Sequence, residues 1–327
     1  MPPPSYPSDR PRYTADLRST LRWASYGRGD STMAQLFVIA SLFLAFNVFA
    51  AESILVGVLE EPQCAQAKDV KARVMFQRTT NGWIGLNSPE STAPAYVTKQ
   101  TWTIALDGRQ LGSVILSDPS PSKDDKSDWT YTRDKLFVPK GDVPVRASHN
   151  VFAGWCDTPK VRPLALLSRP MVSDPAGWKP FRVPVEYRQR LYGPLKKSFG
   201  NAAVVRCRDP EGVKSEVFRF GASDLRIFKG YKSKSEGVII SIGLDPKKYG
   251  CDGPANTADN SWSNHWFHIR EDQIKLFGIG LELVDSGDYD GDGASELLFW
   301  KSAYNRNGYV LVFDKMGKMT EYVWSYH

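Results

Sequence analysis

Apolar positions after residue 50 fall in short runs rich in Val, Ile, Leu, Phe and Trp, and most runs end at Gly, Asp or Pro. Branched and aromatic side chains favour strands, whereas Gly, Asp and Pro favour turns. The pattern therefore predicts β-structure along the whole of this region. We expect strands at 53–61, 70–77, 136–140, 162–167, 203–207, 215–220, 224–230, 237–244, 266–270, 274–277, 281–285, 295–300, 308–314 and 320–326.

The clearest local signal is a β-hairpin at 101–118, where two β-rich segments flank the tight-turn pair Asp107-Gly108. A polar, Pro-containing loop is expected at 117–128. The best helix candidate is 184–200, and Gly193-Pro194 is expected to break it. This segment would separate an N-terminal β-rich region, 51–200, from a C-terminal β region, 201–327.

Strict alternation of apolar and polar residues is weak in several of these strands. SELLFW at 295–300 and GVIISIGL at 237–244 are nearly continuous apolar runs, as expected of strands covered on both faces. A propeller produces such strands because each blade lies between its neighbours. We predict an all-β, β-propeller-like fold with about five degenerate blades. The alternative is an N-terminal β-sandwich-like domain followed by a separate C-terminal β-domain.

Residues 33–50 have the features of a secretory signal peptide. An apolar core runs from Leu36 to Phe46, short for a membrane span, and Val48 and Ala50 place small residues before a cleavage site. Cleavage would make the protein secreted or periplasmic. The alternatives are an uncleaved membrane anchor and a buried core helix. Residues 1–32 are expected to be a disordered or untranslated extension, with translation beginning at Met33.

Composition adds two constraints. The chain has 42 Lys and Arg and 36 Asp and Glu, which gives a net charge of +6. This is a mild positive excess for 327 residues. We find no basic stripe with interleaved aromatic residues, so no nucleic-acid partner is predicted. Four cysteines in an exported chain indicate disulfides, and we favour the sequence-local pairs Cys64–Cys156 and Cys207–Cys251. Buried free thiols are the alternative.

The most specific motif is DYDGDGASE at 288–296. Asp288, Asp290 and Asp292 stand two residues apart, and Glu296 lies eight residues after the first. This spacing matches positions 1, 3, 5 and 9 of a calcium loop, and the carbonyl of Ala294 would stand at position 7. The alternative is a metal-free polar loop rich in Asx turns. We predict a Ca²⁺ ion held by these five residues.

The segment SGDYDGDGASELLFW, 286–300, resembles the calcium loop of FG-GAP and VCBS-type repeats, which form blades of integrin-α-like β-propellers. The resemblance covers residues 277–326 and implies a blade that holds a structural Ca²⁺ ion. Phe277-Gly278 resembles the family's opening pair but stands about three residues too far upstream, and Trp300-Lys301-Ser302 replaces the closing Gly-Ala-Pro. We find a single such loop, which puts in doubt how many blades the chain contains.

Other residue types give weaker signals. His265 and His268 would lie on opposite faces of a strand and so would not form a metal pair. Trp83, Trp155 and Trp262 would either stack on sugars or pack in the core, and packing is the favoured interpretation. No Gly-x-Ser-x-Gly, His-Glu-x-x-His or phosphate-binding glycine motif occurs, and Ser120-Pro121-Ser122-Lys123 fits Ser-x-x-Lys only by chance within a polar loop.

These signals predict an exported calcium-binding β-protein that acts as a binding or scaffold module, with an unknown protein or glycan ligand. A first alternative is an exported hydrolase or lyase acting on polysaccharide. A second is a membrane-anchored envelope component, which requires that the segment 33–50 is not cleaved. We identify no catalytic residues in the sequence.

Overall fold

The computed structural model divides the chain into two units, Met1–Glu52 and Ser53–His327. The structure describes residues 54–63, 69–87, 100–116, 136–144, 152, 154, 157–170, 173–199, 205–207, 215–217, 219–245, 264–303 and 305–325, all in the second unit. The predicted extension and signal segment, Cys64, Cys156, Cys251, Trp155, Trp262 and the loop at 117–128 therefore lie outside the described residues. Among the residues that are described, no helix is long and apolar enough to span a membrane.

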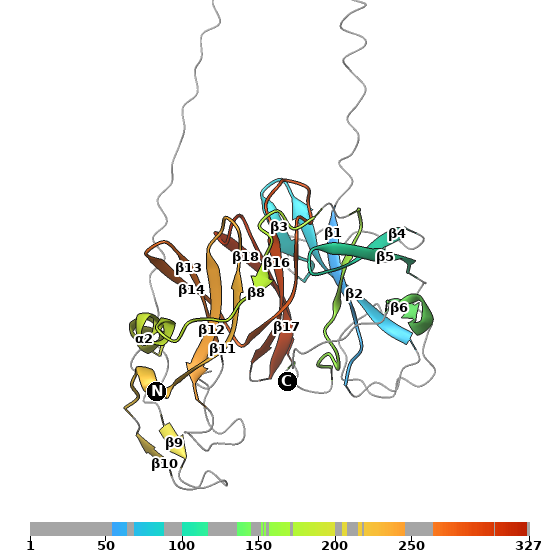
Figure 1. Ribbon diagram of the computed structural model, residues 1–327. Helices are drawn as coiled ribbons and strands as arrows, with labels where there is room; N and C mark the ends of the chain where they lie inside the picture. Colours follow the sequence, from blue (N-terminus) through green and yellow to red (C-terminus); the bar gives the residue numbers. More distant parts are fainter. Residues whose placement is uncertain are drawn as a thin grey trace, which may run out of the picture. The chain divides into compact units, whose positions relative to one another are not determined.

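The described chain is an all-β protein built from antiparallel sheets, with one α-helix among these residues (Figure 1). The N-terminal sheet, called sheet A, has the order β3-β2-β1-β7-β4-β5, and β6 also pairs with β2. Its strands are β1 (Leu55–Glu60), β2 (Asp69–Thr79), β3 (Gly82–Gly85), β4 (Thr101–Leu106), β5 (Arg109–Ile115), β6 (Leu136–Pro139) and β7 (Leu164–Leu167).

The C-terminal half contains two consecutive antiparallel meanders. Sheet C has the order β14-β13-β12-β11-β8, and sheet E has the order β15-β16-β17-β18. The strands of sheet C are β8 (Lys179–Pro180), β11 (Leu225–Lys232), β12 (Val238–Leu244), β13 (His265–Arg270) and β14 (Gln273–Ile279). Those of sheet E are β15 (Leu281–Gly287), β16 (Glu296–Ala303), β17 (Arg306–Phe313) and β18 (Lys318–Ser325).

The remaining elements are short. The helix α2 spans Tyr187–Ser198, and β9 (Val205–Cys207) pairs with β10 (Ser215–Val217) in a separate two-stranded sheet. Single 3₁₀ turns form at η1 (Lys140–Asp142) and η2 (Ala222–Asp224). Of the four cysteines, Cys207 alone lies in a described element.

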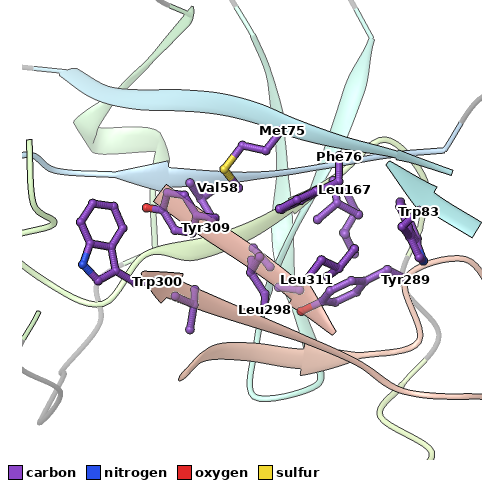
Figure 2. Close-up of a cluster of buried hydrophobic side chains, with 14 of the residues drawn as sticks. Val58, Met75, Phe76, Trp83, Leu167, Tyr289, Leu298, Trp300, Tyr309 and Leu311 are labelled. Atoms are coloured by element: carbon purple, nitrogen blue, oxygen red, sulfur yellow. The ribbon is translucent and has the colours of Figure 1, made fainter. Parts of the chain in front are cut away.

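Sheet E is covered on both faces, which explains the nearly continuous apolar runs in its strands. Leu298, Tyr309 and Leu311 pack with side chains of sheet A, among them Val58 and Phe76; we call this cluster the A–E core (Figure 2). The alternate residues of the same strands face the other way. They form the C–E core with side chains of sheet C: Leu297, Phe299, Val310 and Val312 pack with Tyr231, Ile239, Trp266 and Phe277.

A β-bulge in β15, between Leu283 and Asp285, interrupts this alternation. Leu283 belongs to the C–E core, whereas Val284 belongs to the A–E core. Asp285 is paired with Leu298, and cross-strand partners share a face of a sheet. The bulge therefore directs a fully buried carboxyl group toward sheet A.

The helix packs on the outer face of sheet C. Leu191 and Leu195 are fully buried among apolar residues of β11, β12 and β13, in a cluster that we call the outer core. The expected break at Gly193-Pro194 is wrong, because the helix continues through Pro194. The two buried leucines on either side of Pro194 hold the backbone in place although the proline cannot donate a helical hydrogen bond.

Most predicted strands are confirmed, and the predicted hairpin forms as β4 and β5. Asp107 and Gly108 both have positive φ, at 52° and 67°, as a type I′ turn requires. Strands β3 and β8 were not predicted. Trp83, on β3, is 4% exposed and belongs to the A–E core, so it packs in the interior and does not present a stacking face.

Candidate metal centre

The acidic loop joins β15 to β16 and is folded by its own carboxylates. Asp288 accepts hydrogen bonds from the backbone N–H of Gly291 at 2.7 Å and of Gly293 at 3.0 Å. Both glycines have positive φ, at 77° and 83°, which few other residues adopt readily. The side chains thus hold the backbone in a tight curve around the acidic groups.

Asp290 and Asp292 likewise accept hydrogen bonds from backbone N–H groups of the loop. Asp290 Oδ1 accepts from the N–H of Asp292 at 3.2 Å, and Asp292 Oδ1 accepts from the N–H of Ala294 at 2.8 Å. The Tyr289 N–H donates to Glu296 Oε2 at 2.7 Å, which joins the beginning of the loop to its end. These bonds keep the four acidic side chains within one turn of the chain.

Three of the predicted ligands lie together. Asp288, Asp290 and Glu296 each place a carboxylate oxygen within 4.8 Å of the others. Asp288 and Glu296 are buried, at 5% and 1% exposed. Asp292 is exposed and does not belong to this group, while Ala294 is buried beside it in the loop. Carboxylate oxygens at this density are the donors that Ca²⁺ prefers, so the residues present fit a calcium ion.

The electrostatics of this group are unfavourable in the absence of a cation. Burial and the neighbouring Asp290, Asp292 and Asp288 raise the pKa of Glu296 from 4.5 to about 9. A proton is one way to relieve this repulsion, and a divalent cation is another. A pKa raised to this extent means that Glu296 carries a proton near neutral pH unless a positive partner is close.

Two arginines from outside the loop hold Asp290. The Arg78 guanidinium, from β2, forms an ion pair with Asp290 Oδ2, and the Asp290 side chain is 5% exposed. Arg169 donates from Nη1 to the Asp290 carbonyl at 2.5 Å. A Cβ at Gly291 would lie 2.8 Å from Arg169 Nη2, so the guanidinium occupies the space that this glycine leaves. Sheet A therefore supplies a positive charge to the acidic loop.

A further segment, 173–178, braces both ends of the loop. Ser173 accepts from the Asp288 N–H at 2.8 Å, and the Ala176 N–H donates to Ser295 Oγ at 3.0 Å. Asp174 accepts from the hydroxyls of Ser295 at 2.5 Å and Ser286 at 2.9 Å. It also accepts from the N–H groups of Gly177 and Trp178. One carboxylate thus joins the two strands that enter and leave the loop.

The loop is also anchored in the hydrophobic interior. The Tyr289 ring, between two acidic residues in sequence, is fully buried in the A–E core, where Figure 2 shows it beside Leu311. Its hydroxyl donates to Asp285 Oδ2 at 3.0 Å, and Asp285 Oδ1 accepts from the Gly108 N–H at 3.4 Å. Burial raises the pKa of Asp285 to about 6. Asp285, which has no place in the ligand spacing, links the β4–β5 turn to the loop.

His265 and His268 lie outside this group and apart from each other. The His265 ring packs edge-on against Phe199, which belongs to the outer core. His268 places Nε2 2.6 Å from the Glu236 carbonyl, and burial lowers its pKa. The two rings lie on opposite faces of β13, as the spacing predicted.

Sequence reasoning did not identify Arg78, Arg169 or Asp174. Arg78 and Asp290 are separated by 212 residues, and Asp174 and Ser295 by 121. No local pattern around these residues indicates the contact, because each stands in an ordinary turn or strand. Comparisons with protein-family models, curated proteins and solved structures found no match to this chain.

Proposed function

We propose that this chain is an exported calcium-binding β-protein that acts as a binding or scaffold module. The observation that supports the proposal best is the meeting of Asp288, Asp290 and Glu296 within 4.8 Å in a loop held from three sides. A bound Ca²⁺ ion would be held by these carboxylates, and it would neutralise their repulsion and order the loop. The ion would thus have a structural role, with the ligand-binding surface elsewhere.

We further propose that sheets C and E are two neighbouring blades of a propeller-like arrangement. Each contains a four-stranded meander of consecutive strands, β11–β14 and β15–β18. They pack face to face through the C–E core, as adjacent blades do. Sheet A, with its order β3-β2-β1-β7-β4-β5, does not follow this plan and would be the degenerate part.

The test of the metal site is a thermal melt with excess CaCl₂ and with excess EDTA, combined with calorimetric titration of Ca²⁺. At a free calcium concentration 100-fold above Kd, the native state gains about 2.7 kcal/mol. Asp288→Asn and Glu296→Gln should abolish most of this gain. Asp292→Asn should reduce it less, because Asp292 lies outside the group of three.

The matched control is Asp272→Asn, an exposed aspartate in the turn between β13 and β14. This variant removes the same charge and should bind calcium like the parent protein. A melt that does not move between CaCl₂ and EDTA, with no heat in the titration, would refute the metal site. Equal weakening by Asp272→Asn and Asp288→Asn would show only a general effect of charge.

A further inference from the structure

The positive charge of the chain is concentrated in one short segment. Residues 179–199 contain six Lys or Arg and one Glu, a net charge of +5, and the whole chain has a net charge of +6. The rest of the chain is therefore almost neutral. Aromatic residues Phe181, Tyr187, Tyr192 and Phe199 are interleaved with these cations, so the prediction that the chain has no basic stripe does not hold for this segment.

The structure separates an inner and an outer face of this segment. Leu191 and Leu195 are buried against sheet C, whereas Lys196 and Lys197 are exposed on the opposite side of α2. Arg190 is exposed too, and its Nη2 donates to the Glu271 carbonyl, in the turn between β13 and β14, at 2.5 Å. Lys179 and Arg182, which precede the helix, are exposed as well. We call the five exposed cations together with Val185 the α2 face. The buried leucines fix the helix on sheet C, so the lysines on the helix project from a firm support.

Few negative charges oppose these cations. The elements packed against α2 include η2 and the strands β11 to β14, and the acids on η2 and on the β13–β14 turn are Asp224, Glu271 and Asp272. Glu186 stands at the start of the helix. No ion pair found among the described residues involves a cation of the α2 face. The neighbouring sequences 200–204 and 208–214 carry two basic and two acidic residues, so they add no net charge.

Apolar and aromatic groups accompany the cations. Val185 is 67% exposed, the largest exposed fraction among the large apolar side chains that are described. Lys196 lies over the ring of Tyr192 at 6.0 Å, and the Arg190 guanidinium lies 5.9 Å from the ring of Tyr187. Cations with long apolar stems, half-buried tyrosines and an exposed aliphatic residue suit a boundary between water and hydrocarbon.

We propose that the α2 face docks on the anionic headgroup surface of a lipid bilayer. The exposed Val185 and the half-buried Tyr187 and Tyr192 favour a bilayer over a soluble polyanion, because a polyanion offers no hydrocarbon to these groups. Lysines in the last turn of a helix also complement its dipole. That effect does not account for Lys179, Arg182 and Arg190, which lie outside the last turn.

The binding would be electrostatic, with Val185 adding an apolar contact. Each Lys or Arg near an anionic membrane strengthens binding by about fivefold at moderate salt. Attraction of this kind is screened, because the Debye length falls from about 10 Å at 0.1 M salt to about 3 Å at 1 M. The docking needs no metal ion, so it is independent of the calcium site proposed above.

The test is co-sedimentation of the full chain with vesicles in excess EDTA. Vesicles of phosphatidylcholine alone measure whatever the apolar segment 36–46 contributes, and vesicles with added phosphatidylglycerol measure the electrostatic part. Lys196→Gln/Lys197→Gln should lose about 25-fold in affinity for the anionic vesicles, at about fivefold for each side chain. Val185→Ser should weaken vesicle binding while leaving binding to a soluble polyanion such as heparin unchanged.

The matched control is Arg109→Gln/Arg306→Gln, which removes two exposed cations from β5 and β17 and changes the net charge equally. It should retain vesicle binding within about twofold, because these side chains would not lie within a Debye length of the membrane. Three results would overturn the proposal. They are an equal loss in both double variants, no preference for anionic vesicles, or tighter binding to heparin than to vesicles with no effect of Val185→Ser.

Discussion

The Glu296 carboxyl group is buried among three aspartates, and its titration gives the loop a measurable signature. Its pKa is raised from 4.5 to about 9, so the native protein binds a proton that the unfolded chain releases in this range. Stability in EDTA should therefore be fully present below pH 4.5 and should fall as the pH rises toward 9. Thermal melts across this range, with and without calcium, measure the slope of stability against pH.

Two comparisons identify the group responsible. Glu296→Gln, which cannot ionise, should flatten the slope above pH 6. Below pH 6 part of the slope should remain, because Asp285 has a pKa raised to about 6 and acts in the same direction. Bound calcium should also flatten the slope, since it favours the ionised carboxylate. A slope that persists above pH 6 in Glu296→Gln would contradict this assignment.

Arg78 should affect calcium-free and calcium-bound protein differently. Its guanidinium neutralises the buried Asp290 carboxylate, and Arg78 itself is 30% exposed. Arg78→Gln should destabilise the calcium-free protein by about 2 kcal/mol, less than a fully buried pair would lose. Calcium would then replace the missing charge, so the stabilisation by calcium should increase. Urea unfolding in EDTA and in CaCl₂ measures both quantities.

Arg169→Gln is the control for this effect. Arg169 bonds to the Asp290 carbonyl and forms no ion pair with the carboxylate among the described contacts. Its loss should lower stability in both states by a similar amount. A smaller calcium effect in Arg78→Gln than in the parent protein would show that Arg78 mainly positions Asp290 for the metal.

Among individual residues, the sequence predicted the acidic cluster but not the residues that contact it from other parts of the chain. The spacing of Asp288, Asp290 and Glu296 indicates carboxylates on one turn because hydrogen bonds within the loop determine its shape. Arg78 and Asp174 reach the loop through the packing of sheets and connecting segments. That packing depends on the register of the whole fold, which no local pattern encodes.

Among the elements, the β4–β5 turn should be sensitive to substitution at Gly108. Gly108 has φ at 67°, and a Cβ there would lie 2.4 Å from the Asp174 Cβ. Gly108→Ala should therefore destabilise the protein by about 2–3 kcal/mol, through backbone strain and through overpacking against the segment that braces the acidic loop. Chemical denaturation measures the loss.

Gly112, on β5 of the same hairpin, provides the comparison. A Cβ at Gly112 meets nothing within 4 Å, and its φ is not in the left-handed region. Gly112→Ala should be neutral or stabilising by up to about 1 kcal/mol, because alanine restricts the unfolded chain more than glycine does. Equal losses in the two variants would mean that the hairpin tolerates no side chain at either glycine.

Element prediction succeeded where strands were long and rich in branched or aromatic residues. β12 and β16 have buried apolar residues on both faces, and their runs are unmistakable in the sequence. β3 is GWIG, with glycine at both ends, and β8 is only Lys179–Pro180, so neither carries a strand pattern. The helix was predicted to break at Pro194 because local propensity does not include the burial of Leu191 and Leu195.

In the whole molecule, sheet E connects the two other large sheets. Leu298 contributes to the A–E core and Phe299, the next residue, to the C–E core. We therefore expect residues 53–327 to unfold in a single cooperative transition. Leu298→Ala and Phe299→Ala should each lower the free energy of unfolding by about 3–5 kcal/mol. Differential scanning calorimetry provides the measurement.

The calorimetric and van't Hoff enthalpies should agree for the parent protein and for both variants. Separate transitions, with Leu298→Ala shifting one and Phe299→Ala shifting the other, would show that sheets A and C fold as independent domains. Such a result would favour two domains over one continuous stack of sheets.

The central position of sheet E affects the chain while it is being synthesised. Val56 and Val58 are synthesised long before the side chains that cover them, Leu298 and Leu311. The apolar face of sheet A therefore stays uncovered until sheet E has been synthesised. A nascent chain in this state is prone to aggregation. Sheet E thus completes the interior, and a protein truncated before β15 would expose apolar faces on both remaining sheets.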